Sequence, residues 1–235
     1  MGATGRGLPA SSLSDAVAFW STGLGDTHSH DAQIIFCATA GNDDLVRVCL
    51  NIDTAQYFDD AATRLAPDAA GIYILPTLAQ PHSEGEIVLQ SADPDVHPSI
   101  RMHYYDDPHD MQVMVAAVRR ALEIAPHWPE HHKIDPVLIP PFLAAKHGYE
   151  AGEQISDALL EDFALHFSLT VYHHTCTCRI GDVVDPRLRV PGVGKLRVAD
   201  ASVMPNITSG NTNAPTIMIG EKAAEMTGLQ FRTLC

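Results

Sequence analysis

The chain has 235 residues, of which 46% are hydrophobic and 19% are charged, and its formal net charge at pH 7 is −14. This length allows one large or two small folded domains with a buried core. The negative charge disfavours binding to nucleic acid and to anionic membrane surfaces. No apolar run approaches the roughly 18 residues of a membrane span, so we expect a soluble, cytoplasmic protein.

Predicted strands occupy the first part of the chain after an irregular start. Residues 1–33 are rich in small and polar residues without a hydrophobic period, which indicates an irregular N-terminal segment. Short apolar runs bounded by turn residues then predict three strands, namely Gln33–Cys37, Gly71–Pro76 and Glu86–Gln90. A turn at Gly85 leads into the last of them.

Two helices are predicted in the middle of the chain. The first begins after Asp107, which can cap it, and ends before Pro126. Its apolar stripe has helical spacing and consists of Val113, Met114, Ala117, Val118, Ala121, Leu122 and Ala125. Prolines then interrupt the chain up to residue 141, which predicts irregular structure. The second helix runs from its cap Ser156 to Phe167.

The last quarter of the chain predicts a strand, a loop and a helix. Lys195–Val198 is expected to be a short strand, which ends at the Ala199-Asp200-Ala201 stretch. The final helix is expected from Pro215 to about Thr227, with Gly228 as its stop. Free backbone N–H groups at such a helix start can bind anionic or electron-rich groups.

His173 is the candidate general base, because imidazole is the usual acceptor of a hydroxyl proton. Considered alone, a single histidine is more often structural than catalytic. A metal site is not expected, because Cys176 and Cys178 have Cys-x-Cys spacing instead of the Cys-x2-Cys of zinc sites. Five cysteines without a signal peptide also argue against a disulfide framework.

Five sequence blocks from Ala79 to Met226 carry a family resemblance. They read AQPHSEGEIVLQSADP, YYDDPHD, YHHTCTCRIG, VVDPRLRVPGVGKLRVADASVMP and SGNTNAPTIMIGEKAAEM. Together they resemble the C-terminal part of the glucose-methanol-choline (GMC) family of FAD-dependent oxidoreductases, on its choline dehydrogenase and alcohol oxidase side. The resemblance implies an α+β fold, in which an antiparallel sheet carries helices on one face. It also implies a substrate-binding domain over residues 34–171 and an active-site segment over 172–235, whose strand and helix contact FAD.

The same resemblance implies a chemistry and the residues that perform it. Members of this family oxidise CH–OH groups of small alcohols with FAD as cofactor. By the match, His173 takes the hydroxyl proton while a hydride passes to flavin N5, and Asn211 holds the same oxygen. The implied flavin contacts are Asp200, Ala201, Asn211, Thr212 and Asn213. Family members usually carry Gly at the position of Cys176.

Two alternatives stay open beside this interpretation. No Gly-x-Gly-x-x-Gly follows a strand in this chain, although family members hold a Gly-rich phosphate-binding turn in their N-terminal half. The first alternative is therefore a truncated or split chain that is silent without an N-terminal FAD-binding chain, or that acts as a homo-oligomer. The second is a lyase on the same scaffold without net redox chemistry.

Overall fold

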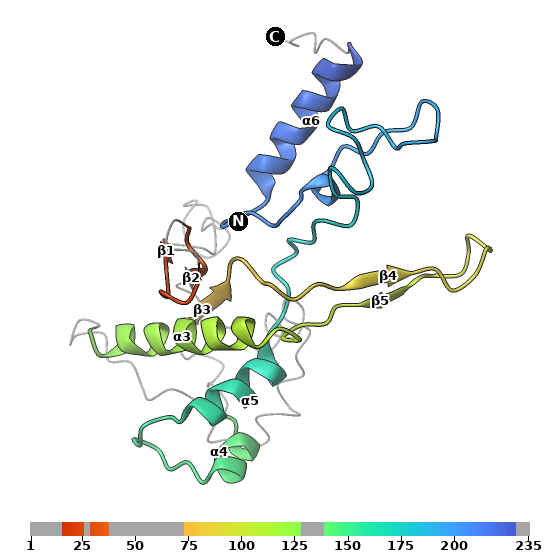
Figure 1. Cartoon of the computed structure of the whole chain (residues 1–235). Helices are drawn as coiled ribbons and strands as arrows, with labels where there is room; N and C mark the ends of the chain where they lie inside the picture. The colour runs from red at the N-terminus through yellow and green to blue at the C-terminus, as the bar shows by residue number, and fades with distance from the viewer. Residues whose placement is uncertain (1–15, 26–28, 38–72, 128–138, 229–235) are drawn as a thin grey trace, which may run out of the picture. The chain divides into compact units, whose positions relative to one another are not determined.

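The computed structural model describes residues 16–25, 29–37, 73–127 and 139–228, which belong to two compact units (Figure 1). The first unit contains residues 1–78 and 108–169, and the second contains residues 79–107 and 170–235. The domain boundaries expected after residues 33 and 171 stay predictions. In the described part of the chain, every helix is too short or too polar to pass through a bilayer.

The first unit contains a three-stranded antiparallel sheet. Its order is β1 (Ala16–Trp20), β2 (Ala32–Cys37) and β3 (Tyr73–Leu78). Ile34 of the central strand is buried and lies opposite Ala18 of β1 and Pro76 of β3. Pro76 is tolerated because β3 is an edge strand, where a missing N–H leaves no partner unpaired.

Strand β1 corrects the expectation of an irregular N-terminal segment. The stretch AVAFW does not alternate polar with apolar residues, and its first four residues are exposed. This strand forms because its backbone pairs with β2. Its side chains show no alternation of polar and apolar residues that could have predicted it. Asp31, just before β2, binds Thr22, just after β1: its buried carboxylate accepts hydrogen bonds from the backbone N–H and the hydroxyl of Thr22 at 2.7 and 2.5 Å. Of the strand expected from residue 71, residues 71 and 72 lie outside the described part.

Helices stack on the sheet of the first unit (Figure 1). Helix α3 (Pro108–Ile124) continues into the short η2 (Ala125–His127) and packs against β2 and β3. Helix α5 (Asp157–Phe167) packs against α3, and α4 (Pro141–His147) packs against α5. Their buried apolar side chains form the core: Val113, Val115, Ala117, Ala121, Leu143, Leu159, Leu160 and Ala164. The α+β architecture expected from the sequence is therefore confirmed.

The helix starts at Ser156 and Pro141 differ in how well the sequence predicts them. The predicted cap Ser156 is confirmed, because its hydroxyl accepts a hydrogen bond from the backbone N–H of Leu159 at 3.3 Å. Helix α4 was missed, since it has only seven residues and follows a proline-broken stretch. It begins at Pro141, where the missing N–H costs nothing because the first turn has no intrahelical partner for it.

The second unit contains a hairpin and the C-terminal segment. Strands β4 (Glu86–Val88) and β5 (Ser99–Arg101) pair antiparallel, so the predicted strand is confirmed but ends two residues earlier. Side chains of Glu86 and Arg101 lie opposite each other and form an ion pair at 2.8 Å. Gly85 is required at the hairpin entry, because a Cβ there would lie 2.5 Å from the carbonyl oxygen of Arg101.

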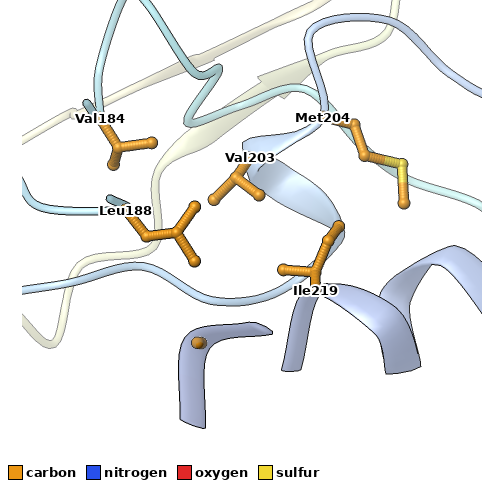
Figure 2. Packing of buried hydrophobic residues seen from close by; sticks show 6 residues of the cluster. Val184, Leu188, Val203, Met204 and Ile219 are labelled. Carbon is orange, nitrogen blue, oxygen red and sulfur yellow. The ribbon is translucent and has the colours of Figure 1, made fainter. Parts of the chain in front are cut away.

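The C-terminal segment folds around a small apolar core. It contains η3 (Ala201–Val203) and α6 (Asn213–Thr227), and Gly228 ends α6 with a positive φ of 75°, as predicted. The core consists of Val184, Leu188, Val203, Met204, Ile219 and Ala223. Figure 2 shows the side chains of Val184, Leu188 and Val203 pointing toward one another beside Ile219 of α6. The core thus joins the loops before η3 to the final helix.

The strand expected at Lys195–Val198 is not formed. Arg197 makes an isolated antiparallel bridge with Arg189, and two backbone hydrogen bonds link Val190 with Leu196 and Val198 with Leu188. The two arms therefore pair only around this one bridge, which is too short to be a strand.

Candidate active site

The segment that carries His173 is held beside η3 by main-chain hydrogen bonds. The N–H groups of Cys176, Cys178 and Ile180 donate to the carbonyls of Ala201, Ser202 and Val203, at 3.4, 2.8 and 3.0 Å. Each bond is independent of side-chain identity, so the backbone alone fixes this pairing. The backbone is therefore held from Cys176 onward, three residues after His173.

Two left-handed residues shape the backbone on either side of His173. Tyr172 has a φ of 63° and Cys176 a φ of 72°, which non-glycine residues rarely adopt. The conformation at Cys176 explains why glycine is expected at this position, because a Cβ makes the left-handed region costly. Such strained residues persist only where the surrounding structure holds them.

Asn211 and Thr212 stand at the beginning of α6. Thr212 is the N-cap residue of this helix, and Ile219 and Ala223 bury one face of the helix in the core that also contains Val203. Packing in that core fixes the position of the helix start relative to η3. Since the His173 segment is bonded to η3, the same core also sets the distance from His173 to Asn211 and Thr212.

His173 contacts both residues through its two ring nitrogens. Nδ2 of Asn211 lies 2.9 Å from Nε2 of His173. The hydroxyl oxygen of Thr212 lies 2.8 Å from Nδ1 of the same ring. All three residues belong to the second unit. The structure thus brings together the two residues that the resemblance identifies as the catalytic pair.

The surroundings of His173 favour the neutral imidazole. Burial lowers its pKa below the ordinary value of 6.5, and the neighbouring charge of His174 lowers it further. His173 is half-buried, whereas His174 is exposed. A neutral imidazole at physiological pH has one nitrogen lone pair that can accept a proton.

The remaining predicted flavin contacts lie at two helix starts. Asp200 caps η3, where its carboxylate accepts a hydrogen bond from the backbone N–H of Ser202 at 2.8 Å. The carbonyl of Ala201 accepts from Cys176 and Met204. Asn213 is the first residue of α6 and is exposed. The structure therefore gives Asp200 and Ala201 roles in local structure, and their contacts with flavin stay predictions.

The contact between Thr212 and His173 was not found by sequence reasoning, which placed Thr212 only among the flavin contacts. A signal was present in Pro215, the third residue of α6. A threonine at an N-cap normally accepts a hydrogen bond from the second or third N–H of the helix. Proline at the third position has no N–H to donate.

A metal ion has no evident place in the described part of the chain. Among those residues, no group of three or more His, Cys, Asp or Glu side chains is arranged to hold one. Cys37, Cys176 and Cys178 are free cysteines.

A family model described as GMC oxidoreductase matches residues 81–220, which is more than half of the chain. The chain belongs to the GMC oxidoreductase family. The matched range contains His173, Asn211 and the first part of α6. It also contains the β4–β5 hairpin with Gly85, so the family identity covers most of the described residues.

Three curated relatives match the C-terminal part of this chain. An uncharacterized GMC-type oxidoreductase of Mycobacterium tuberculosis is 38% identical over 73% of this chain and 32% of its own length. The alcohol dehydrogenase [acceptor] of Pseudomonas putida is 41% identical over 62% of this chain and 25% of its length. The oxygen-dependent choline dehydrogenase of Acinetobacter baumannii is 41% identical over 61% of this chain and 25% of its own length. The chain thus spans about a third or less of the length of these relatives.

Solved structures support the GMC fold. Formate oxidase of Aspergillus oryzae matches with a TM-score of 0.61 and 25% identity, over 88% of this chain and 33% of that one. Pyridoxine 4-oxidase from Mesorbium loti matches with a TM-score of 0.65 and 21% identity, over 94% of this chain and 39% of that one. The second likeness, at its low identity, concerns the fold alone.

Proposed function

We propose that this chain provides the base and the oxygen-binding residue of an FAD-dependent oxidoreductase that acts on CH–OH groups of small alcohols. The observation that carries the proposal is the 2.9 Å contact between Nδ2 of Asn211 and Nε2 of His173, in a member of the GMC family. An amide donor and a basic nitrogen that meet at one point are what an alcohol oxygen needs, because a hydroxyl both donates and accepts hydrogen bonds.

His173 is proposed to act as the general base. The alcohol hydroxyl would enter between the two side chains and donate its hydrogen bond to Nε2 of His173. The lowered pKa keeps this nitrogen unprotonated at neutral pH, so it can take the proton. FAD, when bound, supplies the two-electron acceptor for the hydride that leaves the alcohol carbon.

Asn211 is proposed to stabilise the negative charge that develops on the oxygen. Its Nδ2 donates a hydrogen bond whose strength rises as the hydroxyl becomes an alkoxide. Asn211 is neutral, so it adds no positive charge beside His173, whereas a cationic neighbour would reduce the proton affinity of the ring. In this proposal His173 binds the proton, and Asn211 binds the oxygen.

The start of α6 suits the electron-rich part of FAD. Thr212 makes no side-chain capping bond to this helix, and Asn211, Asn213 and Ala214 are exposed at its start. The first N–H groups of a helix have no intrahelical partner and carry partial positive charge. We therefore propose that Asn213 and the α6 start hold FAD, together with Asp200 and Ala201 at the start of η3.

The substrate class follows from names borne by relatives. Two relatives of about 41% identity are called alcohol dehydrogenase and choline dehydrogenase. The proposal for this chain is accordingly a primary or secondary alcohol of small size.

A second candidate is a chain that acts only with an FAD-binding partner. The observation behind it is that the chain spans 25–32% of its curated relatives. In that case the His173–Asn211 pair is one side of a site, and a second polypeptide or a second copy completes it.

The first experiment separates these two candidates. The purified 235-residue chain is incubated with FAD and desalted, and its visible absorbance is recorded. A retained flavin band supports cofactor binding by this chain alone. Loss of the band contradicts it and favours the partner, which is then tested by adding the FAD-binding part of a GMC relative.

The second experiment tests the base. In the flavin-loaded form, His173→Ala should slow anaerobic flavin reduction by an alcohol by about 100-fold or more, because general base catalysis is lost. The matched control is His174→Ala, measured well above pH 6.5, where His173 stays neutral without the His174 charge and the rate should stay near that of the wild type. Equal rates in wild type and His173→Ala would refute the assignment. Alcohol turnover without flavin reduction would indicate a lyase.

A further inference from the structure

Thr212 occupies a position in the site that the proposed reaction does not yet use. It is 6% exposed, and its hydroxyl lies 2.8 Å from Nδ1 of His173, on the side of the ring opposite Asn211. Two neutral polar side chains therefore bracket one imidazole. Each ring nitrogen has its own partner, so the pair of contacts determines which nitrogen carries the proton.

The local sequence removes one of the partners that this hydroxyl would have as a cap of its own helix. Thr212 is the N-cap of α6 but makes no side-chain capping bond. Pro215 at the third helical position lacks the N–H to which an N-cap hydroxyl commonly binds. Thr216 holds the backbone of Thr212 instead, since its N–H and its hydroxyl donate to the Thr212 carbonyl at 3.0 and 2.6 Å.

The two contacts are consistent with one tautomer of the neutral ring. An amide Nδ2 can only donate, so Nε2 beside Asn211 must be the unprotonated nitrogen. Nδ1 then carries the hydrogen and needs an acceptor. A hydroxyl oxygen has two lone pairs and can provide it, and Thr212 lies at the right distance.

We propose that Thr212 is a positioning residue that accepts the Nδ1–H of His173 and so holds the ring in the tautomer whose Nε2 lone pair faces Asn211. The catalytic meaning of this arrangement rests on the proposed function, whereas the tautomer itself does not. Without the hydroxyl, the Nδ1–H loses its acceptor, and only the Asn211 amide still opposes the other tautomer. The tautomer with its hydrogen on Nε2 then becomes more populated, and that hydrogen would block the nitrogen that has to take the alcohol proton.

The tautomer is measured by 15N NMR on the 235-residue chain labelled at histidine nitrogens, above the pKa of His173. Signals of His173 are assigned by their loss in His173→Gln. The expected result in the wild type is a protonated Nδ1 and an unprotonated Nε2. In Thr212→Val, which removes the hydroxyl but keeps the side-chain shape, the hydrogen should move toward Nε2. Thr212→Ser should restore the wild-type pattern.

The matched control is Thr216→Val. This substitution removes another hydroxyl from the first turn of α6, and the backbone N–H of Thr216 still donates to the Thr212 carbonyl. The tautomer should stay as in the wild type. A hydrogen on Nε2 of the wild type, or an unchanged pattern in Thr212→Val, overturns the proposal. The first point needs only the wild-type spectrum and its assignment with His173→Gln, so it does not depend on the folding of Thr212→Val.

A kinetic measurement separates this proposal from the proposed function. In the flavin-loaded form, Thr212→Val should lower the limiting rate of flavin reduction by about tenfold, the effect of one lost hydrogen bond in the transition state. Half-saturation by the alcohol should change little, and Thr212→Ser should recover the rate. If the wild type does not reduce flavin at all, the proposed function fails, while the NMR result still decides the role of Thr212. A wild-type rate in Thr212→Val contradicts the positioning role.

Discussion

At the scale of single residues, the site depends on the electrostatic surroundings of His173. Burial and the nearby charge of His174 both disfavour the imidazolium, so the pKa lies below 6.5. The unfolded chain then binds a proton at a higher pH than the folded chain. As the pH falls through 6.5, this difference removes stability, and the loss is complete once the pH is below the folded pKa.

The titration of His173 checks this account. We expect an NMR titration midpoint below 6.5 for the signals that disappear in His173→Gln. In the flavin-loaded form, flavin reduction should decline on the acidic side with the same midpoint, because the protonated ring cannot act as base. A midpoint at or above 6.5 would contradict the effect of burial.

At the scale of elements, α6 carries the residues that meet His173, so its ends matter for the site. Gly228 closes the helix with a φ of 75°, and its N–H donates to the carbonyls of Ala224 and Glu225. Gly220 lies inside the same helix with ordinary backbone angles. At both positions an added Cβ would meet no atom within 4 Å. The two glycines therefore differ in backbone conformation but not in available space.

Substitution of these two glycines by alanine should have opposite effects. Gly228→Ala should lower the free energy of unfolding by about 1 kcal/mol, because a Cβ is unfavourable at positive φ. Gly220→Ala should raise it by about 0.5–1 kcal/mol, since alanine loses less backbone entropy in a helix. Urea unfolding of both variants measures the difference. Two shifts of the same sign would show that backbone conformation is not the deciding factor.

At the scale of the whole molecule, each compact unit has its own core, and the site belongs to the second one. The core around Val203 connects η3 with α6, and thereby His173 with Thr212. Val203 is fully buried. Loss of packing at this point should therefore affect both the stability of the unit and the contacts of the imidazole.

Val203→Ala tests this connection. The cavity left by the missing methyl groups should lower the free energy of unfolding by roughly 1–3 kcal/mol. The 15N signals of His173 should also shift, because η3 and the start of α6 lose their common support. Val193→Ala is the control, since Val193 is 51% exposed and its loss should change stability by less than about 0.5 kcal/mol. Unchanged His173 signals in a destabilised Val203→Ala would show that the core does not position the site.

The sequence by itself determined the elements with strong local signals. Helices α3 and α5, the cap Ser156 and the stop Gly228 could be predicted because spacing, capping and positive φ act within a few residues. The family, and with it His173 and Asn211 as the candidate pair, came from five sequence blocks. Composition also indicated a folded protein with a large negative charge.

Only the tertiary structure decided the features that depend on partners distant in the sequence. Strand β1 exists through its pairing with β2, and the expected strand at Lys195–Val198 reduces to a bridge with Arg189, because pairing length cannot be read from one strand. The contact of Thr212 with Nδ1 of His173 joins residues 39 positions apart. Local sequence shows that the Thr212 hydroxyl lacks one of its usual helix partners, but only packing of α6 against η3 shows which group replaces it.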